Sequence, residues 1–459
     1  MKVAVSGSTG FVGKHLISAM IERDFNIIGL TRSHSISSNS KLEFRTCDLY
    51  SLLDAERSLE GCDVAIYLVH SMNPSVRLSQ GTFIDFDFLL ADNFAKACER
   101  NKIKRIIYVS GIVPFGNLTS AHLKSRYEVE KTLLKHKTPL TTFRTGIVLG
   151  PEGSSFDMIR KIINRLPIIL LPRWTLNKIQ VLSIKDLVDA ILLEIEKNDG
   201  VDDGSFDLAH PKVFRYAGLV KKISRKVGKK NIFIKFPIIP SFVSKHWISA
   251  ITGHPRSLVF PLVESLKHSM VADKERLWPF KKDFEPVDSS ILWSWNKKNA
   301  VPLPVSSKTP VPFNRLVRSV QRLPVPEGWS MKEVALEYMK WLETFFGPLL
   351  KIKRDGDLLY FCTYFFKSPL LTLEFSRERT FETRELFYIV GGVLARKRKD
   401  ARLEFRESPE RDFFIAAIHN YNPSLPWYIY RYTQALVHSY VMRKFGDHLR
   451  GLSSKRREG

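Results

Sequence analysis

The first thirteen residues, MKVAVSGSTGFVG, constrain the fold more than any other stretch of the chain. Residues 2–6 are an apolar run typical of a buried strand, and residues 14–23 have helical periodicity. Between them lies a glycine turn, and this order is typical of a dinucleotide site. Glycines permit the tight turn, the approach of backbone N–H groups to a pyrophosphate, and close helix–strand packing. The predicted nucleotide-binding residues are Gly7, Ser8, Thr9, Gly10, Phe11, Val12 and Gly13.

The glycine spacing is G-x-x-G-x-x-G, which differs from the dehydrogenase pattern G-x-G-x-x-G, so an ordinary strand–helix turn is the alternative. Strand and helix patterns nevertheless alternate with short links through the first 150 residues. This order predicts an α/β fold with a doubly wound parallel sheet and right-handed crossovers. Ligands of such sheets bind at the carboxyl ends of the strands. The expected strands lie at 2–6, 26–31, 42–46, 63–69, 105–110 and 141–149.

Polar side chains stand where these strands end. A carboxylate after the second strand would favour NAD, whereas Arg32 at this point suits the 2′-phosphate of NADP, unless it is a solvated loop arginine. Asp48 and Leu49 follow the third strand, where a carboxylate can accept from an adenine amino group. We therefore predict NADP as the cofactor, with NAD as the other possibility. The residues expected beside the nicotinamide ribose are Val69, His70 and Ser71.

Two of the polar patterns leave alternatives open. His70 suits either a proton carrier or a histidine that holds its loop in place. Tyr127 and Lys131 share one helix face at i and i+4, and a nearby ammonium would lower the tyrosine pKa, as a reductase requires.

Length and composition limit the remaining possibilities. A chain of 459 residues with 44% hydrophobic residues is expected to form two or three folded domains. Its four cysteines have no metal-like spacing, so we predict a reducing compartment and no metal site. We expect no signal peptide, and no apolar run reaches the roughly 18–20 residues of a membrane span, which favours the cytoplasm.

The formal net charge of +24 includes one segment, 208–263, that contains no acidic residue. This segment also carries the apolar stretch 236–251, so it suits a peripheral contact with an anionic membrane or a phosphorylated ligand. A solvated basic surface and the apolar face of a substrate lobe are the alternatives. We expect no nucleic-acid partner, because no reading helix or aromatic platform accompanies the charge. The sequence does not indicate an oligomeric state.

Several motifs together resemble the atypical and extended short-chain dehydrogenase/reductases. The similarity is greatest to the NAD(P)H-binding, nitrogen-regulator-like branch, which is related to the nucleotide-binding accessory subunit of respiratory complex I. The resemblance covers roughly residues 1–300. The motifs that carry it are SGSTGFVG, YLVHSM, RIIYVSGI, HLKSRYEVEKTLL, TTFRTGIVLGPEG and IQVLSIKDLVDAI.

This resemblance implies catalytic positions on the helix near residues 122–135. The family motif is Tyr-x-x-x-Lys with a Glu four residues after the Lys, and Glu130 matches that Glu. Arg126 then occupies the lysine position and His122 the tyrosine position, so Tyr127 and Lys131 are one register off and their pairing is a coincidence. Together with Ser110 at a strand end, His122 and Arg126 are the candidate catalytic residues. Either they serve a working reductase, or catalysis has been lost and the nucleotide is only bound.

The expected organisation is a Rossmann domain with a small substrate lobe over residues 1–296, a Pro-, Ser- and Lys-rich linker over 297–312, and an α+β domain over 313–459. The second domain shows a strand, a helix, several antiparallel strands and a long final helix, an order that resembles helix-grip or START-like folds. The leading prediction is an NAD(P)H-dependent oxidoreductase for an apolar, lipid- or quinone-like substrate. The alternative is a nucleotide-binding sensor or scaffold protein without turnover.

Overall fold

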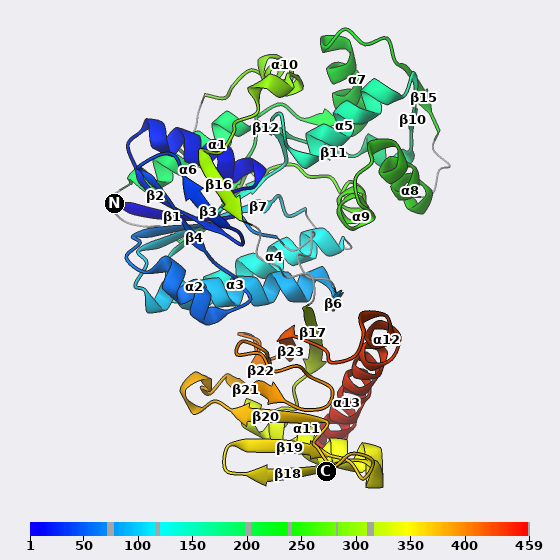
Figure 1. The fold of residues 1–459 in the computed structure, drawn as a ribbon. Coiled ribbons are helices and arrows are strands. Elements are labelled where there is room, and N and C mark those ends of the chain that lie inside the picture. Colours follow the sequence, from blue (N-terminus) through cyan, green and yellow to red (C-terminus); the bar gives the residue numbers. More distant parts are fainter. Residues whose placement is uncertain are drawn as a thin grey trace. The chain divides into compact units, whose positions relative to one another are not determined.

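The computed structural model describes residues 1–70, 78–114, 120–197, 203–236, 241–280, 283–309 and 316–457. The chain divides into two compact units, which Figure 1 shows. The N-terminal unit comprises residues 1–73 and 87–311, and the C-terminal unit comprises residues 74–86 and 312–459.

A sheet of seven parallel strands is the centre of the N-terminal unit, as the alternating sequence pattern predicts. Its spatial order is β13-β8-β7-β5-β1-β2-β4, so the strand order reverses beside β1. The central strands are buried on both faces, which explains their nearly continuous apolar sequences. The strands are β1 (Lys2–Ser6), β2 (Asn26–Thr31), β4 (Leu42–Thr46), β5 (Val64–Tyr67), β7 (Arg105–Gly111), β8 (Leu140–Thr145) and β13 (Gly204–Leu208).

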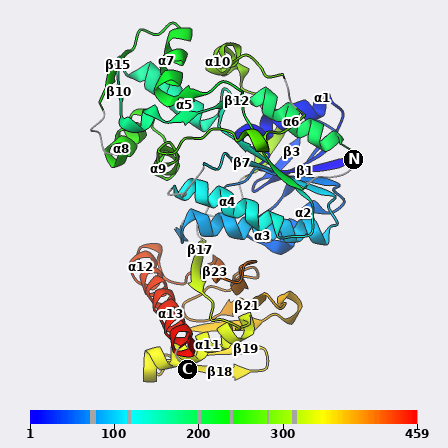
Figure 2. The same cartoon turned by 180° about the vertical axis from the view of Figure 1, so that it is seen from behind.

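Helices cover both faces of this sheet. Figures 1 and 2 show α1 and α6 on one face and α2, α3 and α4 on the other, so the sheet is doubly wound. This arrangement places the β1–α1 turn at the carboxyl edge, where ligands of such sheets bind. The helices are α1 (Phe11–Glu22), α2 (Leu52–Leu59), α3 (Phe83–Arg100), α4 (Ala121–Leu134) and α6 (Ile184–Glu196).

A smaller lobe with its own apolar core extends the N-terminal unit. Strand β10 (Ile168–Leu171) of this lobe pairs in parallel with β15 (Ile232–Lys235). The short strands β9 (Ile147–Leu149) and β12 (Val181–Ser183) also pair in parallel. The helices of this lobe are α5 (Ser154–Arg165), α7 (Tyr216–Lys226), α8 (Ser241–Thr252), α9 (Arg256–Ser265) and α10 (Val287–Trp295).

The segment predicted as a linker, 297–312, contains regular structure within its described part. Strand β16 (Val305–Thr309) pairs antiparallel with β3 (His34–Ser37), which follows β2. The hydroxyl of Ser306 also donates a hydrogen bond to the carbonyl of Ile36 (3.1 Å). The prolines of this segment lie outside β16, whose sequence is VSSKT, so each residue of the strand has a backbone N–H for pairing.

The C-terminal unit is an α+β domain, as predicted. Its sheet has the order β18-β19-β20-β21-β22-β23-β17-β6, with antiparallel pairing except between β17 and β6. Helix α11 (Met331–Phe346) and the long α13 (Gln434–Arg457) contribute to one core with the sheet. A short helix, α12 (Trp427–Tyr432), precedes α13. The strands are β17 (Val317–Pro324), β18 (Lys351–Asp355), β19 (Leu358–Cys362), β20 (Leu371–Phe375), β21 (Arg384–Gly391), β22 (Arg402–Glu407) and β23 (Phe413–Tyr421).

One strand of this sheet comes from far away in the sequence. Strand β6 (Leu78–Gln80) lies between β5 and α3 in the chain, yet it pairs with β17 at the sheet edge. The sequence contains no motif that predicts this insertion, because a three-residue strand is too short for a recognisable hydrophobic period.

Candidate nucleotide and substrate site

The β1–α1 turn has the geometry of a nucleotide cradle. Gly7 has a positive φ of 71°, and the N–H of Gly10 donates to its carbonyl (2.9 Å), which closes the turn. A Cβ on Gly13 would lie 2.4 Å from the Gly7 oxygen, so only glycine allows the helix to approach the turn this closely. Ser8 fixes the turn by donating to the carbonyl of Leu30 on β2 (2.8 Å).

The N-terminus of α1 suits an anionic ligand. Thr9 and Gly10 are exposed, Phe11 and Val12 are partly exposed, and no side chain caps the helix. The first backbone N–H groups of α1 and the positive end of its dipole therefore face a position where a pyrophosphate can bind. The residues present fit a dinucleotide, and the predicted turn residues lie together at one place.

The other predicted cofactor residues lie at the carboxyl ends of the same sheet. Arg32 is exposed directly after β2. Asp48 and Leu49 are buried after β4, and the Asp48 carboxylate accepts from the N–H of Tyr50 (3.3 Å). Val69 and His70 follow β5. Ser71 lies outside the described residues.

The three predicted catalytic residues belong to β7 and α4. Ser110 is buried near the end of β7, and its hydroxyl has no hydrogen-bond partner among the described residues. On α4, His122 and Arg126 are separated by one helical turn and therefore share one face. Nδ1 of His122 is likewise buried without a partner in the described part of the chain. Unpaired polar atoms of this kind are unusual in a folded interior and are typical of a site that awaits a ligand.

A buried carboxylate on α3 was missed by the sequence analysis. Asp87 accepts a hydrogen bond from the hydroxyl of Ser125 (2.7 Å) and forms an ion pair with Arg126 (3.6 Å). Its sequence context, an acid among apolar residues in FIDFDFLL, is the signal that could have indicated it. Asp87 therefore orients Arg126 from a neighbouring helix.

The electrostatics keep both histidines of this site neutral. Burial and, to a smaller extent, the positive charge of Arg126 lower the pKa of His122 to about 3. The surrounding protein lowers the pKa of His70 to about 4, and Arg126 acts in the same direction, although part of the His70 side chain reaches solvent. A neutral imidazole can still donate one hydrogen bond through its N–H group.

The pair Tyr127–Lys131 lies elsewhere on α4. The Lys131 ammonium lies over the Tyr127 ring, 5.1 Å from its centre, which is a cation–π contact. The neighbouring Glu130 is buried and holds Arg144 of β8, whose Nε donates to it at 3.0 Å. Glu130 thus has a structural role between the helix and the sheet.

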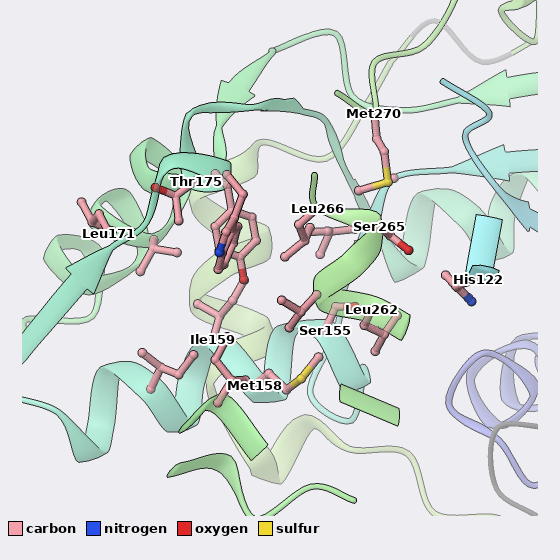
Figure 3. A pocket seen from close by; sticks show the side chains of 18 of the residues that line it. His122, Ser155, Met158, Ile159, Leu171, Thr175, Leu262, Ser265, Leu266 and Met270 are labelled. Atoms are coloured by element: carbon pink, nitrogen blue, oxygen red, sulfur yellow. The ribbon is translucent and has the colours of Figure 1, made fainter. Parts of the chain in front are cut away.

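An apolar pocket of about 130 Å³ begins beside His122. Figure 3 shows the His122 ring at one end of this pocket and Leu171 and Thr175 at the other. The walls come from α5, β10, α7, α8 and α9, and three large aromatic side chains take part: Trp174, Tyr216 and Trp247. The few hydroxyl groups in the lining include Ser155, Thr175 and Ser265. The pocket is therefore suited to a mainly apolar compound that brings one polar group toward His122.

Other kinds of site have no support in the described part of the chain. There, no three His, Cys, Asp or Glu side chains are placed to hold a metal ion together. Among the same residues, no helix combines the length and the apolar character that crossing a membrane requires.

Comparisons with known proteins identify the first part of the chain. Residues 3–209 match the model of the NAD dependent epimerase/dehydratase family. This segment is therefore an NAD(P)-binding Rossmann domain of the extended short-chain dehydrogenase/reductase type, and a further domain follows it. The family model ends before α7, so it does not include the parts of the pocket wall that α7, α8 and α9 contribute.

Two curated proteins show related sequences. The auxiliary protein GraX of Staphylococcus aureus is 25% identical over 188 residues, which cover 39% of this chain and 55% of GraX. A UDP-glucose 4-epimerase of Vibrio cholerae is 24% identical over 217 residues, which cover 42% of this chain and 66% of that enzyme. The chain thus spans less than two thirds of the length of either relative.

A solved structure shows the same fold. A nucleoside-diphosphate-sugar epimerase from Staphylococcus aureus superimposes with a TM-score of 0.52 at 13% identity. The match covers 64% of this chain and 100% of that protein. At this identity the similarity concerns the fold alone.

Proposed function

We propose that the N-terminal unit is an NADP-preferring oxidoreductase that reduces a carbonyl group of an apolar, lipid- or quinone-like compound. The observation that carries this proposal is the apolar pocket that begins at His122, because its walls offer few partners for a strongly polar substrate. The hydroxyl groups of a sugar would remain largely without hydrogen bonds in such a pocket, at a cost in binding free energy. An apolar substrate would instead gain free energy from burial.

The residues present suggest how the chain would position its ligands. The glycine turn would hold the pyrophosphate, and Arg126, fixed by Asp87, would hold a ribose or phosphate group. A bound nicotinamide cofactor supplies a hydride. The N–H of neutral His122 would donate a hydrogen bond to the substrate oxygen as negative charge develops there, and solvent water would supply the proton that completes the alcohol. The hydroxyl of Ser110, which is buried without a partner among the described residues, would offer a second hydrogen-bond donor.

We also propose a narrower group of related proteins for each of the two units. The helix motif with His122 and Arg126 favours the atypical, nitrogen-regulator-like branch of the reductases over the epimerases. The order of strand, helix, antiparallel strands and final helix in the C-terminal unit favours a helix-grip-like fold.

The test is the consumption of NADPH by the full-length protein, followed by absorbance, with quinones, enones and lipid aldehydes offered separately. A second assay offers UDP-glucose with NAD and follows inversion at C4 by chromatography, because epimerisation consumes no NADPH. We expect NADPH consumption with a member of the apolar set and no inversion of UDP-glucose, and inversion of UDP-glucose without NADPH consumption on the apolar set would contradict the assignment of an apolar substrate.

A nucleotide-binding sensor or scaffold without turnover is the second candidate function. The observation that favours it is the absence of a proton donor with a pKa near 7 at His122, together with arginine in the lysine position. Tight NADPH binding, with no NADPH consumption in the presence of any compound of the panel, would support this alternative.

Arg32 provides a test of cofactor preference. The variant Arg32→Ala is expected to weaken NADPH binding by about 1–3 kcal/mol and to leave NADH binding nearly unchanged, because one charge-assisted contact to the 2′-phosphate is lost. The measurement is the ratio of the two dissociation constants by fluorescence titration. Arg173→Ala, which changes an exposed arginine on another element, is the matched control. An unchanged ratio in Arg32→Ala would show that Arg32 points into solvent.

We also propose that the N-terminal unit contacts an anionic lipid surface through β10 and β15. Four aliphatic side chains are exposed where these two strands pair, since Ile168 lies opposite Ile232 and Leu170 lies opposite Ile234. Their exposed fractions of 38–59% are high for residues of this type. Nearby Lys229, Lys230 and Lys235 are exposed and complement anionic headgroups. Because Leu170 also lines the pocket, this contact would bring the pocket close to lipid.

Vesicle sedimentation tests this contact. We expect the protein to bind vesicles that contain phosphatidylserine and to bind much less to phosphatidylcholine alone. Ile234→Glu should abolish the binding, because it places a negative charge among the exposed aliphatic side chains. Leu193→Glu, at an exposed leucine of α6, is the matched control and should bind like the wild type. Equal binding by both variants would refute this surface.

A further inference from the structure

The C-terminal unit contains a second cavity, which is separate from the pocket beside His122. It measures about 130 Å³ and lies in the core between the sheet and helices α11, α12 and α13. Aliphatic and aromatic side chains from β17 and β19–β23 make up most of the wall, together with Tyr338 and Tyr430. For comparison, an engineered apolar cavity of about 150 Å³ in another protein binds benzene, so this volume suits one ring.

The lining determines the charge of a possible ligand. None of the residues that line the cavity is Asp, Glu, Lys or Arg. The one titratable imidazole, that of His438, contacts the hydroxyl of Ser319 (3.2 Å), and burial lowers its pKa to about 4. His438 is therefore neutral near pH 7. A charged ligand would find no opposite charge here, so the ligand must be neutral.

Two glutamine side chains in the wall provide acceptors that the described residues leave unused. Gln80 of β6 donates through Nε2 to the carbonyl of Ala435 (2.7 Å) and to Ser439 (3.0 Å). Gln434 donates through Nε2 to the hydroxyl of Tyr421 (2.5 Å), which itself donates to the carbonyl of Leu394 (2.6 Å).

These contacts fix the orientation of both amide groups. The Oε1 atoms of Gln80 and Gln434 are buried, and neither accepts a hydrogen bond from a described residue. An unsatisfied buried acceptor costs free energy, which a donor on a ligand would recover.

We propose that this cavity binds a small neutral ring compound that carries a hydroxyl or N–H group. The ring would occupy the apolar part, and its donor would reach Oε1 of Gln434 or Gln80. The pairing of β6 with β17 brings Gln80, a polar residue from the N-terminal half of the sequence, into a wall that is otherwise built by the C-terminal half.

Fluorine NMR of the full-length protein tests this proposal with two matched probes, para-fluorophenol and fluorobenzene, which differ by one hydroxyl group. We expect saturable binding of both and about tenfold tighter binding of the phenol, which corresponds to one hydrogen bond. Gln434→Met and Gln80→Met keep the side-chain volume nearly constant, and at least one of them should remove the preference for the phenol.

Cavity-filling variants assign the binding to one of the two cavities. Leu403→Phe in the C-terminal wall should weaken the binding of both probes, whereas Ile159→Phe in the N-terminal pocket should leave it unchanged. If Leu403→Phe fails to fold, the glutamine variants and Ile159→Phe still decide the question. Binding that is lost in Ile159→Phe, no saturable binding, or equal affinity for both probes would overturn the proposal.

Discussion

The variant Gly10→Asp should lose at least about 100-fold in affinity for NADPH and keep its thermal stability. Gly10 immediately precedes α1, where its backbone has φ −79° and ψ 175°, which any residue adopts. The position is exposed, and an added Cβ would meet only the Gly7 oxygen, at 3.1 Å. Aspartate is also a favourable residue at a helix N-cap, so the fold should tolerate the change.

The loss of affinity has an electrostatic cause. Two like charges about 4 Å apart repel each other by about 4 kcal/mol at the effective dielectric constant of a protein surface. A carboxylate on residue 10 would lie where the helix N-terminus otherwise attracts the pyrophosphate. Isothermal titration with NADPH measures the effect, and a melting curve without ligand checks the fold.

Gly10→Asn is the matched control for this prediction. It has the same shape and N-cap ability as aspartate but no charge, so it should bind NADPH much more tightly than Gly10→Asp. Equal affinities in the wild type and Gly10→Asp would mean that the nucleotide does not bind at this helix.

Local patterns explain why the N-terminal sheet could be predicted from the sequence. Most residues of β1 and β5 are apolar because both faces of the sheet are covered. The first turn requires glycines for steric reasons, so the sequence also indicates where this turn lies. The position of His122 and Arg126 on one face of α4 was also predictable, because residues four apart in a helix share a face. The order of elements in the C-terminal unit was likewise predictable, because each strand is long enough to show its period.

The substrate pocket and the second cavity could not be predicted in this way. The pocket combines side chains from elements spread between β7 and α9, and only the tertiary fold brings them together. Asp87 reaches Arg126 from another helix, and Gln80 enters a core that is otherwise formed more than 230 residues later in the chain. Such long-range contacts leave no period or spacing in the sequence. For the same reason, β16 could not be recognised within a segment with the composition of a linker.

His122→Ala should reduce turnover of an apolar carbonyl compound by about 100-fold or more, with NADPH affinity unchanged. The reason is the loss of a buried hydrogen-bond donor at the end of the pocket, where charge would develop on the substrate oxygen. Ser155→Ala is the matched control, because Ser155 also lines the pocket (Figure 3) but lies on α5, whereas His122 lies on α4. This variant should change kcat little. Full activity of His122→Ala would show that His122 takes no part in the reaction.

The pH dependence distinguishes a neutral donor from an imidazolium acid. An imidazolium with the ordinary histidine pKa of 6.5 would lose its proton above that pH, and kcat would fall there. Because burial lowers the pKa of His122 to about 3, its ring is neutral throughout the range above about pH 5, and kcat should show no step from it.

The same shift affects stability with a defined sign. Between about pH 3 and pH 6.5, the unfolded chain binds a proton at His122 and the native protein does not, so acid favours unfolding. Relative to His122→Ala, the wild type should therefore lose stability as the pH falls through this window. A kcat that follows an ionisation near 6.5 would show instead that His122 works as an imidazolium and that its environment opens to water during turnover.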